Sequence, residues 1–250
     1  MKNLPLHIER IFLKDSINCN SEEYPFNLPV IQNFRSLEFR KPVTFLVGEN
    51  GSGKSTLLEA FAVCYGFNPE GGSKNFNFST MSSHSSFHEC LRITKSYNHA
   101  KDGYFLRAES YYNVASEIER LDSEGRGTPI KMSYGGKSLH DQSHGESFWS
   151  LLQHRLGGNG VYIFDEPEAA LSPMRLLSLL VRIDELVKLN SQFIISTHSP
   201  IIMAYPNADI YEITEGKLKL TQFEDTEHFI ITKYFVNQYK KLLHELKIDV

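Results

Sequence analysis

The feature that most constrains this chain is the stretch GENGSGKS at residues 48–55, because of what flanks it. The preceding VTFLV is apolar throughout, as in a buried strand, whereas LLEAFAVCYGF after it repeats its apolar residues at helical spacing. Strand, glycine-rich loop and helix in this order are the context required for a phosphate-binding loop of the pattern G-x-x-x-x-G-K-[ST]. An accidental glycine turn is the alternative, and the matching strand and helix argue against it.

Each residue type in this loop has a chemical use. Glycines let backbone N–H groups turn inward onto phosphate oxygens, and the N-terminus of the following helix adds a partial positive charge. We expect Lys54 to reach the β and γ phosphates of a nucleotide, and Ser55 to place its hydroxyl on Mg²⁺, a hard ion that prefers oxygen ligands. The predicted nucleotide-binding residues of the loop are Gly48, Asn50, Gly51, Ser52, Gly53, Lys54, Ser55 and Thr56.

Two further apolar strands end in polar residues that suit the same chemistry. VYIFDEPEAAL places Asp165 and Glu166 at the carboxyl end of a strand, where open α/β sheets bind their ligands. Asp165 is predicted to hold Mg²⁺ and Glu166 to act as the catalytic base on the attacking water, with two acids in a solvated loop as the alternative. FIISTHSP is likewise an apolar strand that ends in polar residues. His198 is predicted to hydrogen-bond the γ-phosphate, although a lone histidine in this setting is more often structural.

Length and composition indicate how large a core the chain can form and in which compartment the protein is expected. With 250 residues, 41% hydrophobic and 12% aromatic, the chain can fill a large core, and no internal repeat or long linker divides it. No apolar run approaches the roughly 18–20 residues that cross a bilayer, so we expect no membrane insertion. Three cysteines without C-x-x-C spacing fit a reducing compartment, and the protein is predicted to be cytoplasmic. The net charge of −4 gives no global attraction to nucleic acid.

The rest of the chain predicts alternating strands and helices. HIERIFL, LRIT and YFLRAE are typical of strands, and helices are expected over 111–123 and 174–190, the latter capped by Ser172 and Pro173. Residues 71–86 are rich in Gly, Ser, Asn and Phe and predict an irregular excursion.

The C-terminal segment predicts a hairpin turn around Glu215 and Gly216 and a final helix from about Thr226 to Leu246. We expect the lysines of that helix to form a solvated face rather than a stripe for nucleic acid. Its apolar face is expected to pack on the domain, with a partner protein as the alternative. The residues of that face are Phe229, Ile230, Phe235 and Leu242.

A third polar stretch, QSHGES at residues 142–147, precedes the apolar FWSLLQ. Ser143 can cap the first free N–H groups of a helix, and Glu146 lies three residues later, as in a capping box. Locally, an ordinary structural cap is sufficient to explain the pattern.

Together these motifs resemble an ABC-type ATPase, with GENGSGKST as Walker A, VYIFDEPEAAL as Walker B with the D-loop, and FIISTHSP as the histidine switch. QSHGES is similar to the signature of that superfamily, since Gly145 lies twenty positions before Asp165, although His144 and Glu146 depart from L-S-G-G-Q. The resemblance implies that Ser143 and Gly145 approach the γ-phosphate of a nucleotide bound by a second subunit. Within the superfamily, the chain resembles the soluble SMC, RecF and DNA-break-repair branch, and especially its stand-alone AAA family ATPases.

The resemblance implies an α/β P-loop NTPase fold of the ABC type. Such a fold has a mostly parallel core sheet, an N-terminal antiparallel β part and a helical signature subdomain. We expect one domain over residues 1–250, with the helical subdomain at about 79–158 inserted between Walker A and Walker B.

Two further departures from the family pattern concern the Q-loop and the end of the D-loop. No glutamine lies between Lys54 and Gln142, so the usual Q-loop residue is missing, and Glu109 or Ser110 is the candidate substitute. The D-loop ends in Ser172, where the family often has Asp. We expect hydrolysis to survive both changes.

The function implied by the resemblance is that of a soluble ATPase with ATP and Mg²⁺ as cofactors. It forms a head-to-tail homodimer around two ATP molecules and opens after hydrolysis. By analogy with the branch, the partner is nucleic acid in a repair or defence system. One alternative is an ATP-gated module with slow hydrolysis that a partner effector protein reads. Another is the ATP-binding subunit of a transporter, against which the missing glutamine argues.

Overall fold

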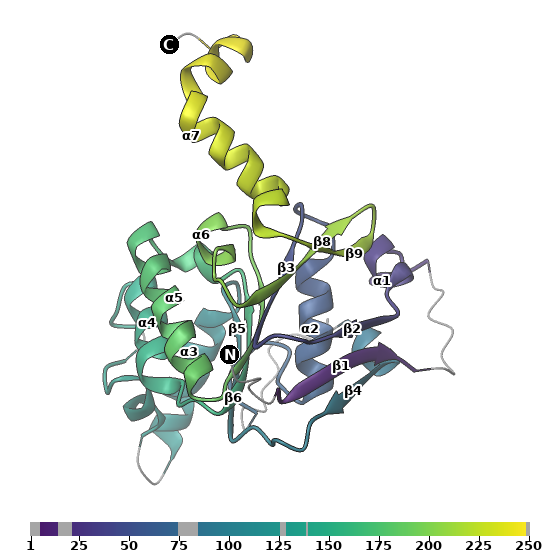
Figure 1. Cartoon of the computed structure of the whole chain (residues 1–250). Coiled ribbons are helices and arrows are strands. Elements are labelled where there is room, and N and C mark those ends of the chain that lie inside the picture. Colours follow the sequence, from purple (N-terminus) through teal and green to yellow (C-terminus); the bar gives the residue numbers. More distant parts are fainter. Residues whose placement is uncertain (1–5, 15–21, 75–84, 126–128, 139, 249–250) are drawn as a thin grey trace.

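A six-stranded sheet lies at the centre of the molecule (Figure 1). The computed structural model describes residues 6–14, 22–74, 85–125, 129–138 and 140–248. The first five strands in spatial order run parallel, and the sixth pairs antiparallel with the fifth. In that order the strands are β5 (Asp102–Arg107), β6 (Gly160–Asp165), β7 (Gln192–Ser196), β3 (Val43–Val47), β8 (Ala208–Thr214) and β9 (Lys217–Thr221). Strands β3, β6 and β7 are buried along their whole length, which explains their largely continuous apolar sequences.

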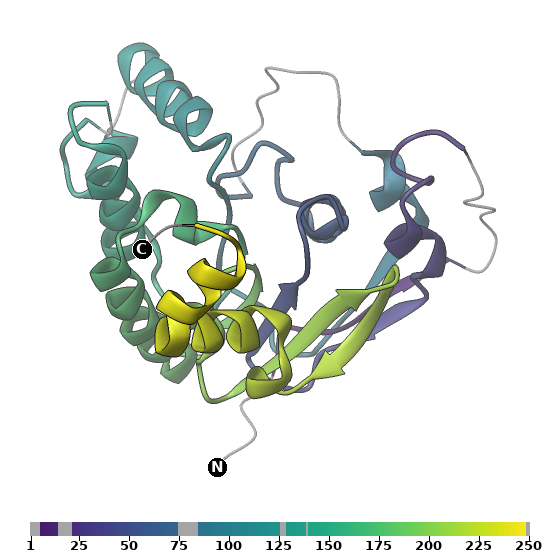
Figure 2. The same cartoon turned by 90° about the horizontal axis from the view of Figure 1, so that it is seen from above.

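A three-stranded antiparallel sheet faces the main sheet across helix α2 (Lys54–Tyr65). Its order is β2 (Ser36–Glu38), β1 (Ile8–Leu13) and β4 (Leu91–Lys95). Side chains of α2, such as Leu57 and Phe61, share one buried cluster with Ile11 of β1 and Ile163 of β6. Figure 2 shows α2 end-on between the two layers. The mostly parallel core sheet and the antiparallel part predicted from the sequence are therefore confirmed.

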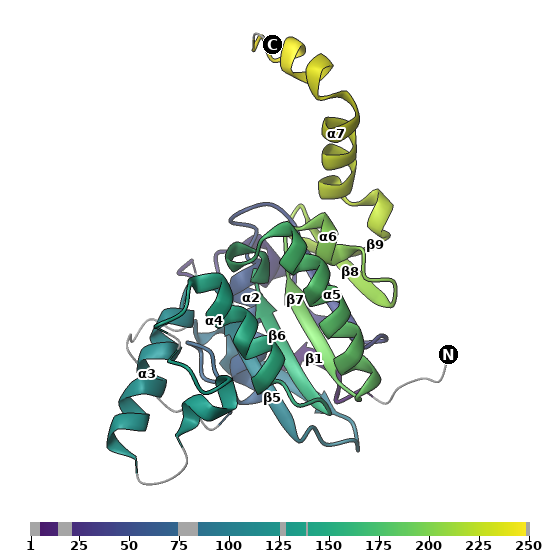
Figure 3. The same ribbon diagram turned by 90° about the vertical axis from the view of Figure 1, so that its left-hand side faces the viewer.

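Helices cover the opposite face of the main sheet (Figure 3). They are α3 (Tyr111–Glu124), α4 (His144–Ser150) and α5 (Pro173–Lys188), and α4 continues into a π-helical turn, η3 (Leu151–Arg155). Their apolar side chains form a second buried cluster with β5, β6 and β7. The short helices are α1 (Pro29–Asn33), α6 (Pro200–Met203), η1 (Ser86–Cys90), η2 (Ile130–Tyr134), η4 (Pro167–Ala170) and η5 (Phe223–Asp225).

Several predicted ends of elements are confirmed. The Ser172 hydroxyl accepts a hydrogen bond from the Arg175 N–H at 3.4 Å, and Pro173 begins α5. Glu215 and Gly216 turn the hairpin between β8 and β9 with φ of 51° and 69°. Gly216 packs so closely that a Cβ there would lie 2.4 Å from Pro29 Cβ. The irregular excursion predicted for residues 71–86 falls mostly on 75–84, outside the described residues.

Helix α7 (Glu227–Glu245) projects away from the rest of the molecule (Figures 1 and 3). The helix itself is confirmed, but the expectation that its apolar face packs on the domain is wrong. None of its residues is buried, and Ile230 and Phe235 are 54% and 44% exposed. Only the first turn is anchored, where the Phe229 ring lies 4.6 Å from that of Phe223. No helix in the described part of the chain is long and apolar enough to span a membrane.

Candidate active site

The loop between β3 and α2 has a backbone that only glycine adopts without strain. Gly48, Gly51 and Gly53 have φ of 147°, 79° and 94°. A Cβ on Gly53 would also lie 2.6 Å from Cγ1 of Val30 in α1. These glycines turn the chain so that α2 begins directly at Lys54, with its N-terminal N–H groups at the loop. The arrangement is the one that binds phosphate at a helix N-terminus.

Lys54 is almost fully buried inside the curve of this loop. Its Nζ donates to the carbonyl oxygens of Gly48 at 2.9 Å and Glu49 at 2.8 Å. Burial lowers the pKa of Lys54, and the carboxylates of Glu166 and Asp165 oppose that shift. The ammonium therefore holds the loop closed and faces the carboxylates at the end of β6.

Asp165 ends β6 next to Ser196, the last residue of β7. The Ser196 hydroxyl donates to Asp165 Oδ1 at 2.5 Å, and the hydroxyl of Ser55 also hydrogen-bonds this carboxylate. Arg107 Nε lies 3.8 Å from Asp165 Oδ2. Burial raises the pKa of Asp165, and these partners oppose the rise. The structure therefore brings together Ser55 and Asp165, the two side chains predicted to hold Mg²⁺.

Glu166 has a backbone conformation that is unusual for a residue with a side chain. Its φ of 49° and ψ of 56° are left-handed, which costs a non-glycine residue on the order of 1 kcal/mol. The Glu166 N–H donates to the Ser196 carbonyl at 3.1 Å, which holds this turn in place. The turn directs the Glu166 carboxylate toward His198, whose Nε2 lies 3.1 Å from Glu166 Oε1.

His198 contacts a second histidine that the sequence did not identify. Its Nδ1 lies 3.0 Å from Nε2 of His228, which belongs to the first turn of α7. The pKa of His198 is lowered, first by burial and then by the positive charge of Lys54. His198 is therefore held between Glu166 and His228 as a neutral imidazole at neutral pH.

A pocket of about 250 Å³ joins the loop to the end of β6. Glu166 is the one lining residue that comes from β6 and its following turn. Tyr24 closes another side, where its hydroxyl lies 3.0 Å from Thr56 Oγ1. The lining residues are Tyr24, Leu28, Asn50, Gly51, Gly53, Lys54, Ser55, Thr56 and Glu166. Six of the eight predicted loop residues thus line one pocket with the predicted base.

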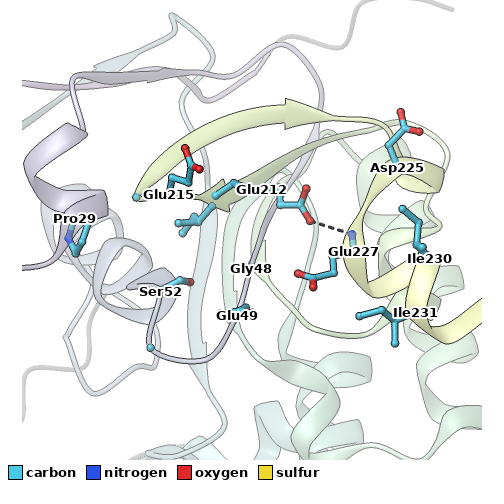
Figure 4. A pocket seen from close by; sticks show the side chains of 14 residues that line it. Pro29, Gly48, Glu49, Ser52, Glu212, Glu215, Asp225, Glu227, Ile230 and Ile231 are labelled. Carbon is cyan, nitrogen blue, oxygen red and sulfur yellow. Dashed lines mark hydrogen bonds between the residues drawn. The ribbon is translucent and has the colours of Figure 1, made fainter. Parts of the chain in front are cut away.

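The two other loop residues, Gly48 and Ser52, line a larger cavity of about 780 Å³ (Figure 4). The Glu227 N–H donates to Glu212 Oε1 there at 3.2 Å. Five carboxylates line this cavity: Glu49, Glu212, Glu215, Asp225 and Glu227. A triphosphate carries several negative charges, so the smaller pocket beside Lys54 suits it better.

The predicted signature residues Ser143 and Gly145 do not line the pocket beside Lys54. They begin α4, where Ser143 and Glu146 form the predicted capping box in both directions. A Cβ on Gly145 would lie 3.1 Å from the carbonyl oxygen of Ala170 in η4, so α4 starts against the turn that follows Glu166. Within one chain, the structure does not bring these residues to the phosphate loop.

Glu168, two residues after Glu166, is a further, partly buried acid that sequence reasoning missed. Its Oε1 accepts from the Thr197 hydroxyl at 2.8 Å and from the His198 N–H at 2.5 Å. Its Oε2 is buried with no hydrogen-bond partner among the described residues. Burial raises the pKa of Glu168. This acid therefore ties the turn after β6 to the backbone of His198.

The sequence matches the models of known protein families. Residues 27–157, just over half of the chain, match the family described as AAA domain. The chain belongs to the AAA domain family. A second AAA domain description, which names an AbiEii toxin and a type IV TA system, matches residues 146–204. Family membership confirms the P-loop ATPase class that the motifs predicted.

Solved structures similar to this AAA domain include the SMC head domain from Thermotoga maritima. That structure is 16% identical with a TM-score of 0.42, over 87% of this chain and 99% of that chain. Another is cbiO1 from Clostridium perfringens, part of the ABC transporter complex cbiONQ. It is 18% identical with a TM-score of 0.49, over 97% of this chain and 100% of that chain. No curated protein matches the sequence. The family assignment therefore rests on the sequence match.

Neither candidate for the missing glutamine in this AAA domain reaches the pocket beside Lys54. Ser110 Oγ donates to the Glu70 carbonyl at 2.5 Å, and the Glu109 side chain is 88% exposed. The residue that contacts Asp165 from this edge is Arg107, which ends β5 and also donates to Glu59 Oε2 at 2.6 Å. Its place at the carboxyl end of a parallel strand was the signal that could have identified it.

Proposed function

We propose that this AAA domain binds ATP with Mg²⁺ at the phosphate loop and hydrolyses its terminal phosphate. Lys54 and the backbone N–H groups at the start of α2 bind the phosphates. Ser55 and Asp165 hold the metal, and Glu166 orients the attacking water and accepts its proton. His198 donates a hydrogen bond to the transferred phosphoryl group.

One observation carries this proposal. Glu166 lines the same 250 Å³ pocket as Lys54, Ser55 and the glycines of the loop, although it lies more than a hundred positions away in sequence. A carboxylate in that place is a suitable base for water next to a bound phosphate. Its left-handed backbone supports a functional role, because a residue in this conformation needs surrounding structure to hold it there.

The oxygen ligands support Mg²⁺ as the metal. The hydroxyl of Ser55 and the carboxylate of Asp165 are hydrogen-bonded to each other, and both are hard ligands. Burial raises the pKa of Asp165, so a divalent cation nearby would offset the cost of its negative charge. When bound, Mg²⁺ neutralises phosphate charge and polarises the bond to the γ-phosphate.

We further propose that two copies of residues 1–250, each acting as a single domain, close head-to-tail around ATP. Ser143 and Gly145 lie at a helix N-terminus outside their own chain's pocket, which suits a role on the partner's nucleotide. The resemblance to the DNA-break-repair branch makes DNA the first polymer to test as the substrate of a repair or defence system.

A second candidate function is an ATP-gated module with slow hydrolysis, read by a partner effector protein. The exposed apolar side chains of α7 favour it. They include Ile230, Ile231, Phe235 and Val236, which are between 44% and 67% exposed. Stimulation of turnover by DNA favours the first candidate, and capture of a protein only in the ATP-trapped state favours the second.

The test compares Glu166→Gln with Glu245→Gln, a matched change at the exposed end of α7. Removing the base should lower ATP turnover about a hundredfold or more, whereas the control should turn over at the wild-type rate. Light scattering with and without Mg·ATP should detect a dimer that accumulates in Glu166→Gln. If Glu166→Gln retains wild-type turnover, the proposed role of the base is wrong. If it loses turnover but stays monomeric with Mg·ATP, only the dimer proposal fails.

A further inference from the structure

His228 is held firmly although the rest of α7 is exposed. Thr226 caps the helix, because its fully buried hydroxyl oxygen accepts from the Phe229 N–H at 3.3 Å. The Glu227 N–H donates to Glu212 Oε1 at 3.2 Å (Figure 4), and the Phe229 ring packs on Phe223. This anchored first turn fixes where the His228 imidazole lies relative to His198.

The three side chains Glu166, His198 and His228 form a chain of two hydrogen bonds, of 3.1 Å and 3.0 Å. An ionised carboxylate can only accept, so His198 Nε2 carries the proton it donates to Glu166. Nδ1 of a neutral His198 then has a lone pair, and His228 Nε2–H is the donor to it. The Glu166 carboxylate therefore determines the tautomer of His198, and His198 determines which nitrogen of His228 carries the proton.

The second ring nitrogen of His228, Nδ1, supports this assignment of protons. Its Nδ1 is buried and has no hydrogen-bond partner among the described residues. A proton there would be a buried donor without an acceptor, which is costly, whereas an unprotonated nitrogen loses less. Burial lowers the pKa of His198, as do the neighbouring Lys54 and His228, whereas the Glu166 carboxylate raises it. Glu168 meets His198 at its backbone N–H.

We infer that His228 is a positioning residue that holds His198 in the Nε2–H tautomer, with its donor directed at the reaction centre. Nothing in the sequence motifs assigns such a role to this position. Without the His228 donor, the Nδ1–H tautomer of neutral His198 becomes accessible, and in that form Nε2 has a lone pair where the carboxylate or a phosphate needs a donor. A movement of the first turn of α7 would withdraw the His228 donor, so the position of α7 would affect the tautomer of His198. The part that concerns turnover rests on the proposed function.

The test uses the full chain with three variants. His228→Phe keeps a ring of similar size and removes the donor. His228→Gln keeps an amide N–H that can take the place of Nε2–H. His244→Phe makes the same change as the first variant at an exposed position near the end of the same helix.

The first readout is the tautomer of His198 by nitrogen NMR of histidine-labelled, nucleotide-free protein, assigned by loss of the signal in His198→Asn. Wild type, His228→Gln and His244→Phe should show the Nε2–H form, and His228→Phe a mixture of the two tautomers. Because this readout needs no ATP, it stands even if the protein does not hydrolyse ATP. A single Nε2–H tautomer in His228→Phe would overturn the inference.

The second readout is the pH profile of ATP turnover. His228→Phe should lower kcat on the order of tenfold at pH 7, the effect of losing one hydrogen bond of ordinary strength, with KM for ATP within about twofold. The acid limb of its profile should move to higher pH, because the pKa of His198 rises without the His228 donor and an imidazolium at His198 holds the Glu166 base more tightly. His228→Gln should restore both quantities. Equal turnover and equal profiles for wild type and His228→Phe would contradict the inference, whereas absent turnover in wild type contradicts only the proposed function.

Discussion

His198 Nε2 lies 3.1 Å from Glu166 Oε1, so the proposed base is hydrogen-bonded to a donor. The same Glu166 carboxylate must be free to take a proton from water if it is to act as a base. A bound γ-phosphate offers His198 a second acceptor and would release Glu166. The contact is thus consistent with a base that becomes active only when the nucleotide is present.

The first prediction tests whether His198 acts in catalysis or in nucleotide binding. His198→Asn should lower kcat for ATP about a hundredfold, because it removes a donor aimed at the transferred phosphoryl group. Nucleotide affinity should stay within about threefold, since Lys54 and the loop N–H groups remain. Turnover rates and titration with a fluorescent ATP analogue measure the two effects. His99→Asn, at an exposed histidine, is the control. Equal losses of affinity and turnover would instead make His198 a binding residue.

The second prediction concerns the left-handed glycines that begin and end α2. Gly53 and Gly66 have φ of 94° and 106°, but a Cβ on Gly53 would lie 2.6 Å from Val30 Cγ1, and a Cβ on Gly66 would meet no atom within 4 Å. Gly66→Ala should lower the free energy of unfolding by about 1–2 kcal/mol, from backbone strain alone. Gly53→Ala should lower it by about 2–5 kcal/mol, because overpacking adds to that strain.

Urea unfolding and nucleotide titration check this pair of variants. Only Gly53→Ala should also lose nucleotide binding, because only that glycine lies in the phosphate loop. Equal unfolding free energies for the two variants would mean that α1 moves aside without cost, and the contact with Val30 would then have no structural importance.

The local parts of the site were predictable from the sequence because each depends on neighbouring residues. The phosphate loop, the acids at the end of β6 and the capping box at Ser143 are set by a few adjacent positions whose residue types have one main structural use. The parallel sheet was implied by the resemblance to ABC-type ATPases, and the buried runs that end in polar residues agree with it, because parallel strands place those ends along one edge.

The contacts that could not be predicted depend on how distant segments meet. The strand end occupied by Arg107 could have been noticed in the sequence, but its contact with Asp165 depends on the register in which β5 and β6 pair, which no local pattern encodes. His228 reaches His198 because α7 starts against the site and then leaves the domain. The periodicity of α7 indicated an amphipathic helix, but periodicity does not say whether its apolar face is covered by the same chain.

The third prediction tests Arg107 as the link between α2 and the metal site. Arg107 pairs with Glu59 at 2.6 Å and lies 3.8 Å from Asp165, and all three side chains are largely buried. Arg107→Met should lower the free energy of unfolding by about 3 kcal/mol, because it leaves the Glu59 carboxylate buried without its cation. The pKa of Asp165 should rise further, so a higher Mg²⁺ concentration should be needed for nucleotide binding.

Two further variants interpret that result. Glu59→Leu combined with Arg107→Met should recover part of the lost stability, because no unpaired carboxylate remains at Glu59. Arg120→Met removes a guanidinium that is itself 52% exposed and pairs with Glu117 and Glu124, and it should change stability much less. If the double variant is as unstable as the sum of the single ones, the two side chains act independently.

The fourth prediction concerns Glu168, whose pKa is raised by burial. A raised pKa means that the folded state binds the proton more tightly than the unfolded state. The resulting stabilisation is complete below the unfolded pKa and is lost as the pH rises through the folded pKa. Ionising the Glu168 carboxylate is therefore costly, because one oxygen is buried without a partner among the described residues. Glu168→Gln keeps the acceptor for the Thr197 hydroxyl and the His198 N–H and removes the charge.

Glu168→Gln should therefore raise the melting temperature of the nucleotide-free protein at pH 7 by about 2–4 °C, the shift expected for roughly 1 kcal/mol in a chain of this size. The difference from wild type should shrink as the pH falls through the raised pKa, because protonated Glu168 carries no charge either. Thermal unfolding between pH 4 and pH 8 measures both effects, with the exposed Glu224→Gln as the matched control. A lower melting temperature at pH 7 would show that the ionised carboxylate stabilises the turn after β6 through its two hydrogen bonds more than its burial costs.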